Sequence, residues 1–104
     1  MELIKVYGLD NCDTTRAAIK QLKQEGKLFE LINLKVFKLT HEILKHWFAQ
    51  KAWEKLLNKR STTWKNLDKS IQEKVIDENA AIDIIIQYPT LLKRPVLVAN
   101  NLIL

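Results

Sequence analysis

Residues 3–19 read LIKVYGLDNCDTTRAAI, and this stretch sets the fold because a strand pattern passes directly into a helix pattern. The β-forming residues 3–7 favour a strand, and the next four residues are typical of a turn. A helix is then expected over about 13–25, with Gly26 able to end it by adopting a positive φ. Residues 28–34 alternate in part and predict a second strand. Strand, helix and strand in this order form a βαβ unit, whose two strands are parallel.

The middle of the chain, about residues 40–88, is predicted to be a helical insertion. Thr40 is a candidate N-cap of its first helix, whose apolar residues follow helical spacing. Further helices are expected at 52–57, 71–76 and 79–88, with a loop over 58–63. The last of these helices is apolar nearly all round, so it is expected to be buried and to end at Pro89.

The C-terminal residues predict a β-hairpin with strands at 96–99 and 102–104. Its turn is Asn100-Asn101, because asparagine tolerates positive φ. The order of a βαβ unit, a helical block and a hairpin predicts an α/β fold of the thioredoxin-like class with a four-stranded mixed sheet. The chain stops at Leu104, so the helix that usually closes such folds is expected to be absent. Without it, the apolar end of the chain is exposed or meets a partner, and a monomer or a weak dimer is expected.

Length and composition favour one soluble globular domain over residues 1–104. At 104 residues the chain is long enough for one core but not for two, and its composition, 47% hydrophobic and 28% charged, is typical of a soluble globular protein. Its apolar runs are shorter than the roughly 20 residues of a membrane span, and its start lacks the form of a signal peptide. A cytoplasmic location without a membrane partner is therefore expected. The net charge of +5 is scattered over many lysines, which favours a solvated surface over direct nucleic-acid binding.

Cys12 is the one cysteine of the chain, and it is expected where the first strand turns into the first helix. A helix N-terminus carries unpaired N–H groups and a partial positive charge, which stabilise a thiolate. The alternative is a small buried core residue, and position alone does not choose between them. His41 and His46 are five residues apart, a poor spacing for two ligands on one helix face, so no metal site is expected.

Three blocks of sequence together resemble the arsenate reductase (ArsC) family, and within it the Spx/YffB-like branch. The blocks are residues 7–14, 56–64 and 88–96, so the resemblance covers nearly the whole chain. It implies a thioredoxin-like fold in which Cys12 is the redox-active thiol.

The resemblance also implies residues that bind a substrate or an anion beside that thiol. The candidates are Arg60, Arg94, Asn11, Thr14 and Pro95. An arginine offers a planar fork of donors to an oxyanion and favours a nearby thiolate, although both arginines could instead form ordinary surface pairs. The peptide bond before Pro95 is expected to be cis, which leaves a backbone edge free for an extended thiol substrate. Thr14 can hydrogen-bond to the sulfur or to the backbone.

Departures from the family pattern decide among three functions. Similar arsenate reductases carry a histidine four residues before the cysteine, where this chain has Gly8, and a C-terminal arginine that it does not reach. Spx-type regulators carry a Cys-x-x-Cys switch, whose second position here is Thr15. The resemblance therefore favours a glutathione-dependent monothiol reductase with Cys12 as nucleophile, glutathione as co-substrate and no bound cofactor. The alternatives are an Spx-type regulator that binds the α-subunit of RNA polymerase and performs no catalysis, and an arsenate reductase.

Overall fold

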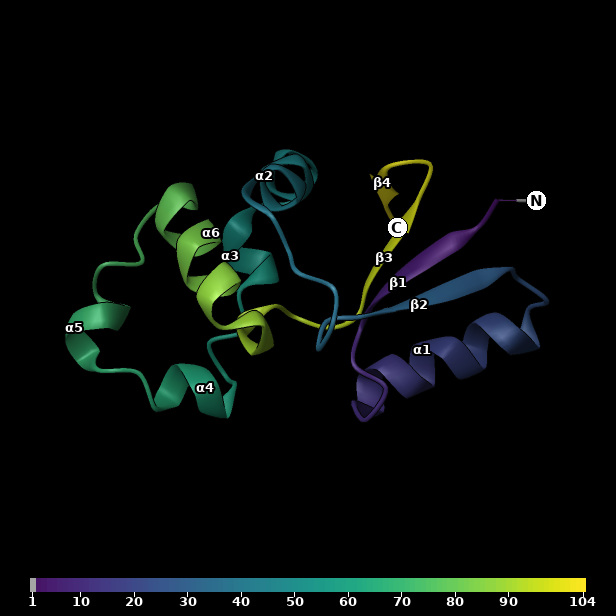
Figure 1. Ribbon diagram of the computed structural model, residues 1–104, viewed down its shortest axis with the longest axis horizontal. Helices are drawn as coiled ribbons and strands as arrows, with labels where there is room; N and C mark the ends of the chain where they lie inside the picture. Colours follow the sequence, from purple (N-terminus) through teal and green to yellow (C-terminus); the bar gives the residue numbers. More distant parts are fainter. Residues whose placement is uncertain (1) are drawn as a thin grey trace. The chain divides into compact units, whose positions relative to one another are not determined.

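The computed structural model describes residues 2–104, which divide into two compact units. The first unit consists of residues 2–38 and Arg94–Leu104, and the second of Leu39–Lys93. All the strands belong to the first unit, and the second is helical (Figure 1). In the described residues, no helix is both long and apolar enough to cross a membrane.

The first unit is built on a four-stranded mixed sheet. Its strands are β1 (Ile4–Gly8), β2 (Phe29–Asn33), β3 (Val96–Ala99) and β4 (Leu102–Ile103). They lie in the order β2-β1-β3-β4, with β1 parallel to β2 and antiparallel to β3, and with β3 antiparallel to β4. The predicted α/β fold class, thioredoxin-like with a four-stranded mixed sheet, is thereby confirmed.

Helix α1 (Asp13–Gln24) connects β1 to β2 and packs beside the sheet (Figure 1). Its Leu22 joins Ile4, Val6 and Ala99 in a buried cluster, so one side of the helix closes one face of the strands. Gly26 has φ +68° just after the helix, as the sequence predicts. This packing fixes where the first turn of α1, and therefore Cys12, lies relative to the end of β1.

The hairpin turn also forms as predicted. Asn100 and Asn101 have φ values of 52° and 65°, in the left-handed region that a two-residue turn of this kind requires. Leu102 and Leu104 are 60% and 65% exposed, so the apolar end of the chain is uncovered within the described residues.

The second unit is a cluster of short helices. They are α2 (His41–Gln50), α3 (Trp53–Leu56), α4 (Thr62–Lys65), α5 (Lys69–Gln72), α6 (Glu78–Gln87) and the 3-10 helix η1 (Pro89–Leu91). The Thr40 side chain accepts a hydrogen bond from the N–H of Ile43, which confirms it as the N-cap of α2. Helices α2 and α6 pack together, and Leu44 and Ile85 are fully buried between the elements of this unit.

Three sequence predictions in the second unit were wrong in detail. The loop expected over 58–63 ends early, because the Ser61 hydroxyl accepts from the N–H of Trp64 and starts α4. The helix expected over 71–76 is instead α5, which ends before Ile76, a side chain that is 76% exposed. Helix α6 leaves Ile86 39% exposed, so it is buried on one side rather than all round.

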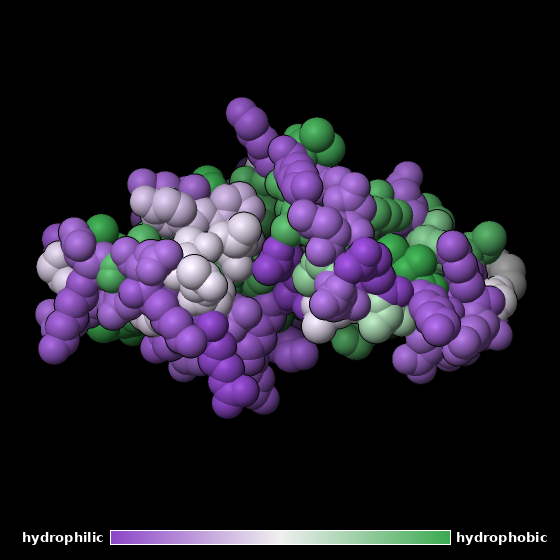
Figure 2. Space-filling view, turned by 90° about the horizontal axis from the view of Figure 1, so that it is seen from below, coloured by the Kyte–Doolittle hydropathy of each residue, from purple (hydrophilic) through white to green (hydrophobic). Residues whose placement is uncertain are grey.

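Most charged side chains are exposed to solvent and are spread along the sequence. Hydrophilic residues cover most of the face seen in Figure 2, and hydrophobic residues lie between them. The two ion pairs described are both exposed and join residues of the first unit, Arg16 with Asp13 and Lys35 with Asp10. Exposed pairs of this kind contribute little to stability.

Candidate functional site

Cys12 is the N-cap residue of α1 and has extended backbone angles. Its own N–H donates to the carbonyl of Leu9 at 3.1 Å, and its carbonyl accepts from the N–H of Arg16 at 2.9 Å. These bonds anchor both sides of the residue, in the turn and in the helix. The thiol is partly exposed rather than buried, so the core-cysteine alternative is excluded.

The surroundings of Cys12 favour its thiolate. Burial raises the pKa of the thiol, but hydrogen bonds with Thr14 and Thr15 and the charge of Arg94 lower it by more. The pKa falls from the usual 9.0 to about 7. The Cys12 side chain does not accept a hydrogen bond as the cap of α1. The nearby N–H of Thr15 nevertheless stabilises the thiolate and helps to lower the pKa of Cys12. At neutral pH both the thiol and the thiolate are therefore well populated.

Thr14 links Cys12 to the segment before β3. Its Oγ1 lies 3.1 Å from the Cys12 sulfur and donates to the backbone oxygen of Arg94 at 3.0 Å. The peptide bond between Arg94 and Pro95 is cis, as expected. The fold therefore brings together Cys12, Thr14 and the Arg94-Pro95 segment, which lies some 80 residues further along the chain.

The other two candidates, Asn11 and Arg60, are both exposed side chains. Asn11 lies in the turn before α1, next to Cys12. Arg60 belongs to the second unit, where its N–H donates to Oδ1 of Asn58 at 3.0 Å. A shared anion site of Arg60 with Arg94 therefore stays a prediction.

Thr15, which lies against Gly8 and helps to lower the pKa of Cys12, was not among the predicted site residues. Thr15 is completely buried, and its Oγ1 accepts from the N–H of Leu9 at 3.4 Å. A Cβ added to Gly8 would lie 2.5 Å from that Oγ1, so the glycine makes room for the threonine. Helical spacing was the available signal, because Thr15 lies seven residues before the buried Leu22 on the same side of α1.

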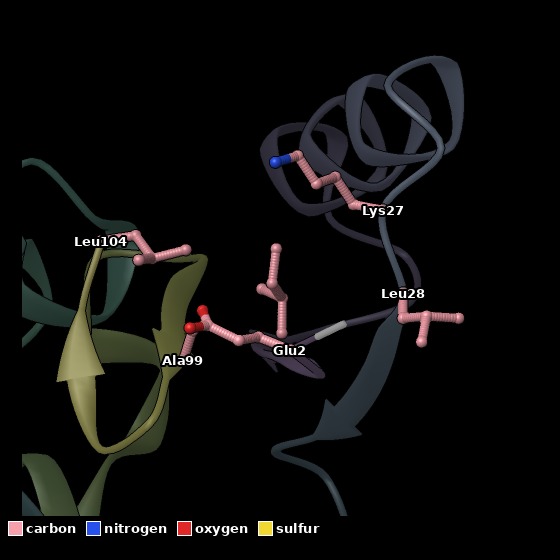
Figure 3. A pocket seen from close by; sticks show the side chains of 6 residues that line it. Glu2, Lys27, Leu28, Ala99 and Leu104 are labelled. Atoms are coloured by element: carbon pink, nitrogen blue, oxygen red, sulfur yellow. The ribbon is translucent and has the colours of Figure 1, made fainter.

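A pocket of about 330 Å³ lies beside the start of β1 (Figure 3), whereas the Cys12 turn follows the end of that strand. Its lining residues are Glu2, Ile4, Lys27, Leu28, Ala99 and Leu104. None of the predicted site residues is among them, so this pocket is separate from the thiol. Among the described residues, no three His, Cys, Asp or Glu side chains gather as they would around a metal ion.

Comparison with known proteins identifies a family and solved structures that this chain resembles. Residues 7–103 match the ArsC family. A protein of Haemophilus influenzae described as uncharacterized is 36% identical over 99 residues, which are 95% of this chain and 86% of that protein.

Solved structures with the same fold include that of a YFFB protein. It has a TM-score of 0.86 and 30% identity, over 91% of this chain and 82% of the other. An arsenate reductase (ArsC) related protein from Brucella melitensis has a TM-score of 0.79 and 29% identity, over 97% and 83% of the two chains. An arsenate reductase from Vibrio cholerae has a TM-score of 0.83 at 18% identity, over 98% and 87%, a likeness of fold alone.

Proposed function

The chain belongs to the ArsC family, and on that premise we propose that it is a glutathione-dependent monothiol reductase with Cys12 as its nucleophile. The observation that carries the proposal is an accessible thiol at the N-terminus of α1, with a pKa of about 7. A thiol whose pKa lies near the ambient pH attacks disulfides best, because it is both ionised and still nucleophilic.

The reaction follows from a single thiol. The Cys12 thiolate attacks the glutathione sulfur of a mixed disulfide, forms a Cys12–glutathione disulfide and releases the substrate as a thiolate, which takes a proton from water. A second glutathione thiolate then attacks the glutathione sulfur of that intermediate. Oxidised glutathione forms, and Cys12 returns as a thiolate. The net reaction converts the mixed disulfide and one reduced glutathione into the free substrate thiol and oxidised glutathione, so no second protein cysteine is required.

The remaining candidates are proposed to bind the glutathione. Arg94, which already favours the thiolate, is suited to a glutathione carboxylate through its planar fork of donors. Arg60 is proposed as a second contact, and Asn11 and Pro95 as parts of the surface that the peptide meets. A cytoplasmic location is proposed with this function, because the mechanism consumes reduced glutathione.

The decisive experiment measures glutathione adducts on Cys12. The protein is treated with oxidised glutathione, and the rate of adduct formation is followed by mass spectrometry in the parent, Arg60→Ala and Arg94→Ala. Lys20→Ala is the control for the loss of one positive charge, because Lys20 is exposed on α1 and is not part of the proposed site. We expect slower adduct formation in the first two variants and a parental rate in the control. A parental rate in all three would reject the anion site.

Two other functions are outcomes of further assays. Arsenate reduction with glutathione as donor is disfavoured by Gly8, because Thr15 fills the space that a larger side chain would need. Binding to the C-terminal domain of the RNA polymerase α-subunit is tested by pull-down. Binding retained in Cys12→Ser, together with an absence of thiol turnover in the parent, would replace the reductase by a regulator.

A further inference from the structure

The hydroxyl of Thr14 stands between two groups that compete for its single hydrogen. One is the Cys12 sulfur, 3.1 Å from Oγ1, and the other is the backbone oxygen of Arg94, 3.0 Å from Oγ1. A carbonyl oxygen only accepts, so the bond to Arg94 uses the Thr14 hydrogen. Toward the sulfur, Thr14 can then only accept, which requires Cys12 to be a protonated thiol that donates.

Ionisation of Cys12 removes that donor. A thiolate only accepts, so a hydrogen bond between Thr14 and the thiolate must use the hydrogen that was bound to the Arg94 carbonyl. A hydrogen bond to a charged acceptor is roughly twice as strong as one to a neutral carbonyl. The hydroxyl is therefore expected to turn toward the sulfur when Cys12 ionises and to release the Arg94 oxygen.

We propose that Thr14 is a proton-linked switch, which binds the Arg94 carbonyl while Cys12 is neutral and stabilises the Cys12 sulfur while it is charged. The ionisation of Cys12 thereby changes the hydrogen bond between the start of α1 and the Arg94 segment, which lies some 80 residues further along the chain. The released carbonyl becomes an acceptor beside the nucleophile at the moment when the nucleophile is active.

The charges around Cys12 do not remove the competition. The Arg94 guanidinium favours the thiolate from the segment before β3. Asp13, on the same helix, is paired with Arg16, and Asp10, in the preceding turn, is paired with Lys35. A pKa of about 7 for the Cys12 thiol means that both states of the switch are populated at neutral pH.

The switch also assigns Thr14 a part in turnover, and this step rests on the proposed reductase function. When the second glutathione thiolate attacks the mixed disulfide, the sulfur–sulfur bond to Cys12 breaks and its electron pair stays on the Cys12 sulfur. The Thr14 hydrogen turns from the Arg94 oxygen to this sulfur as its charge develops. Thr14 therefore stabilises the leaving thiolate, and its loss slows the release of Cys12 from the intermediate.

The test compares Thr14→Val, which lacks the hydroxyl but keeps the shape, with Thr14→Ser, which keeps the hydroxyl. The pKa of Cys12 is measured by pH-dependent alkylation. We expect it to rise by about one unit in Thr14→Val, the effect of one lost charge-assisted bond, and to stay near the parental value in Thr14→Ser. An unchanged pKa in Thr14→Val would overturn the proposal.

A second readout follows the switch at its other end. The carbonyl ¹³C resonance of Arg94 is recorded against pH in the parent and both variants. We expect a titration with the midpoint of Cys12 in the parent and in Thr14→Ser, and none in Cys12→Ser. In Thr14→Val the thiolate charge remains but the hydroxyl is gone, so the titration should be largely lost. A full titration there would show that charge alone moves the resonance and would reject the switch.

These readouts need no turnover, so they separate this proposal from the proposed function. The switch would be supported and the reductase rejected if the Arg94 carbonyl resonance follows the ionisation of Cys12 but the protein does not reduce glutathione mixed disulfides. Reductase activity with an Arg94 resonance that ignores the Cys12 ionisation would reject the switch alone.

Discussion

The close approach of Gly8 and Thr15 makes Gly8→Ala a sharp test of how the Cys12 turn is built. An added Cβ would lie 2.5 Å from Oγ1, 2.8 Å from Cγ2 and 3.2 Å from Cβ of Thr15. Thr15 is completely buried, so its side chain cannot swing into solvent. Overpacking of this kind costs about 1–3 kcal/mol of unfolding free energy. For a chain of this size, each kcal/mol lowers Tm by roughly 4–8 °C.

A double-mutant cycle with Thr15→Ala isolates the contact. Thr15→Ala removes Oγ1 and Cγ2, the two nearest atoms, and leaves only the contact at 3.2 Å. It also costs stability by itself, because the N–H of Leu9 loses its acceptor. In that background Gly8→Ala should cost little, which gives a coupling free energy of about 1–2 kcal/mol in urea denaturation. Thr15→Val keeps the shape of threonine and should give no such relief.

Additive free-energy costs of the two substitutions would contradict a steric limit at Gly8. If Gly8→Ala lowers the unfolding free energy equally in the parental and Thr15→Ala backgrounds, within about 0.5 kcal/mol, the contact does not limit this position. The same variants report on the site. Gly8→Ala pushes on the residue whose N–H and hydroxyl favour the Cys12 thiolate, so the pKa of Cys12 should rise in the alkylation assay.

Other expected outcomes follow from single features of the fold. The pKa of Cys12 is lower in the folded chain than in the unfolded chain, so the unfolded chain binds more protons between pH 7 and 9. The unfolding free energy of the parent relative to Cys12→Ser should therefore rise across that range in urea titrations, and it should fall on acidification through pH 7. Gly26→Ala should cost about 1–2 kcal/mol, because φ is +68° there while no neighbour blocks the methyl group; a thermal melt equal to the parent's would contradict this. Asp77→Ala removes the side chain that caps α6 and should cost about 1 kcal/mol, and Asp77→Asn should restore most of it. If the exposed Leu102 and Leu104 form a weak dimer, sedimentation should show concentration-dependent association that Leu104→Lys abolishes, and a monomer at all concentrations would remove the dimer.

Local patterns determined much of this protein. The passage from residues 3–7 into a helix, the glycine at 26 and the Asn100-Asn101 pair each depend on the conformational preferences of neighbouring residues, and each formed where predicted. The short helices of the second unit were placed less well. In α4 and α5 only four residues are helical, too few for a periodic pattern, so capping and packing set their ends.

The sequence by itself determined the position of Cys12 at a helix N-terminus, because that follows from a strand, a turn and a helix in succession. Only the tertiary structure decided what surrounds the sulfur. The Arg94 carbonyl reaches Thr14 because β3 pairs beside β1, and Gly8 admits Thr15 because α1 packs against the same strand. The contact between Thr14 and Arg94 joins residues 80 positions apart and leaves no periodic signal in the sequence, so this part of the surroundings of the thiol is a property of the folded sheet.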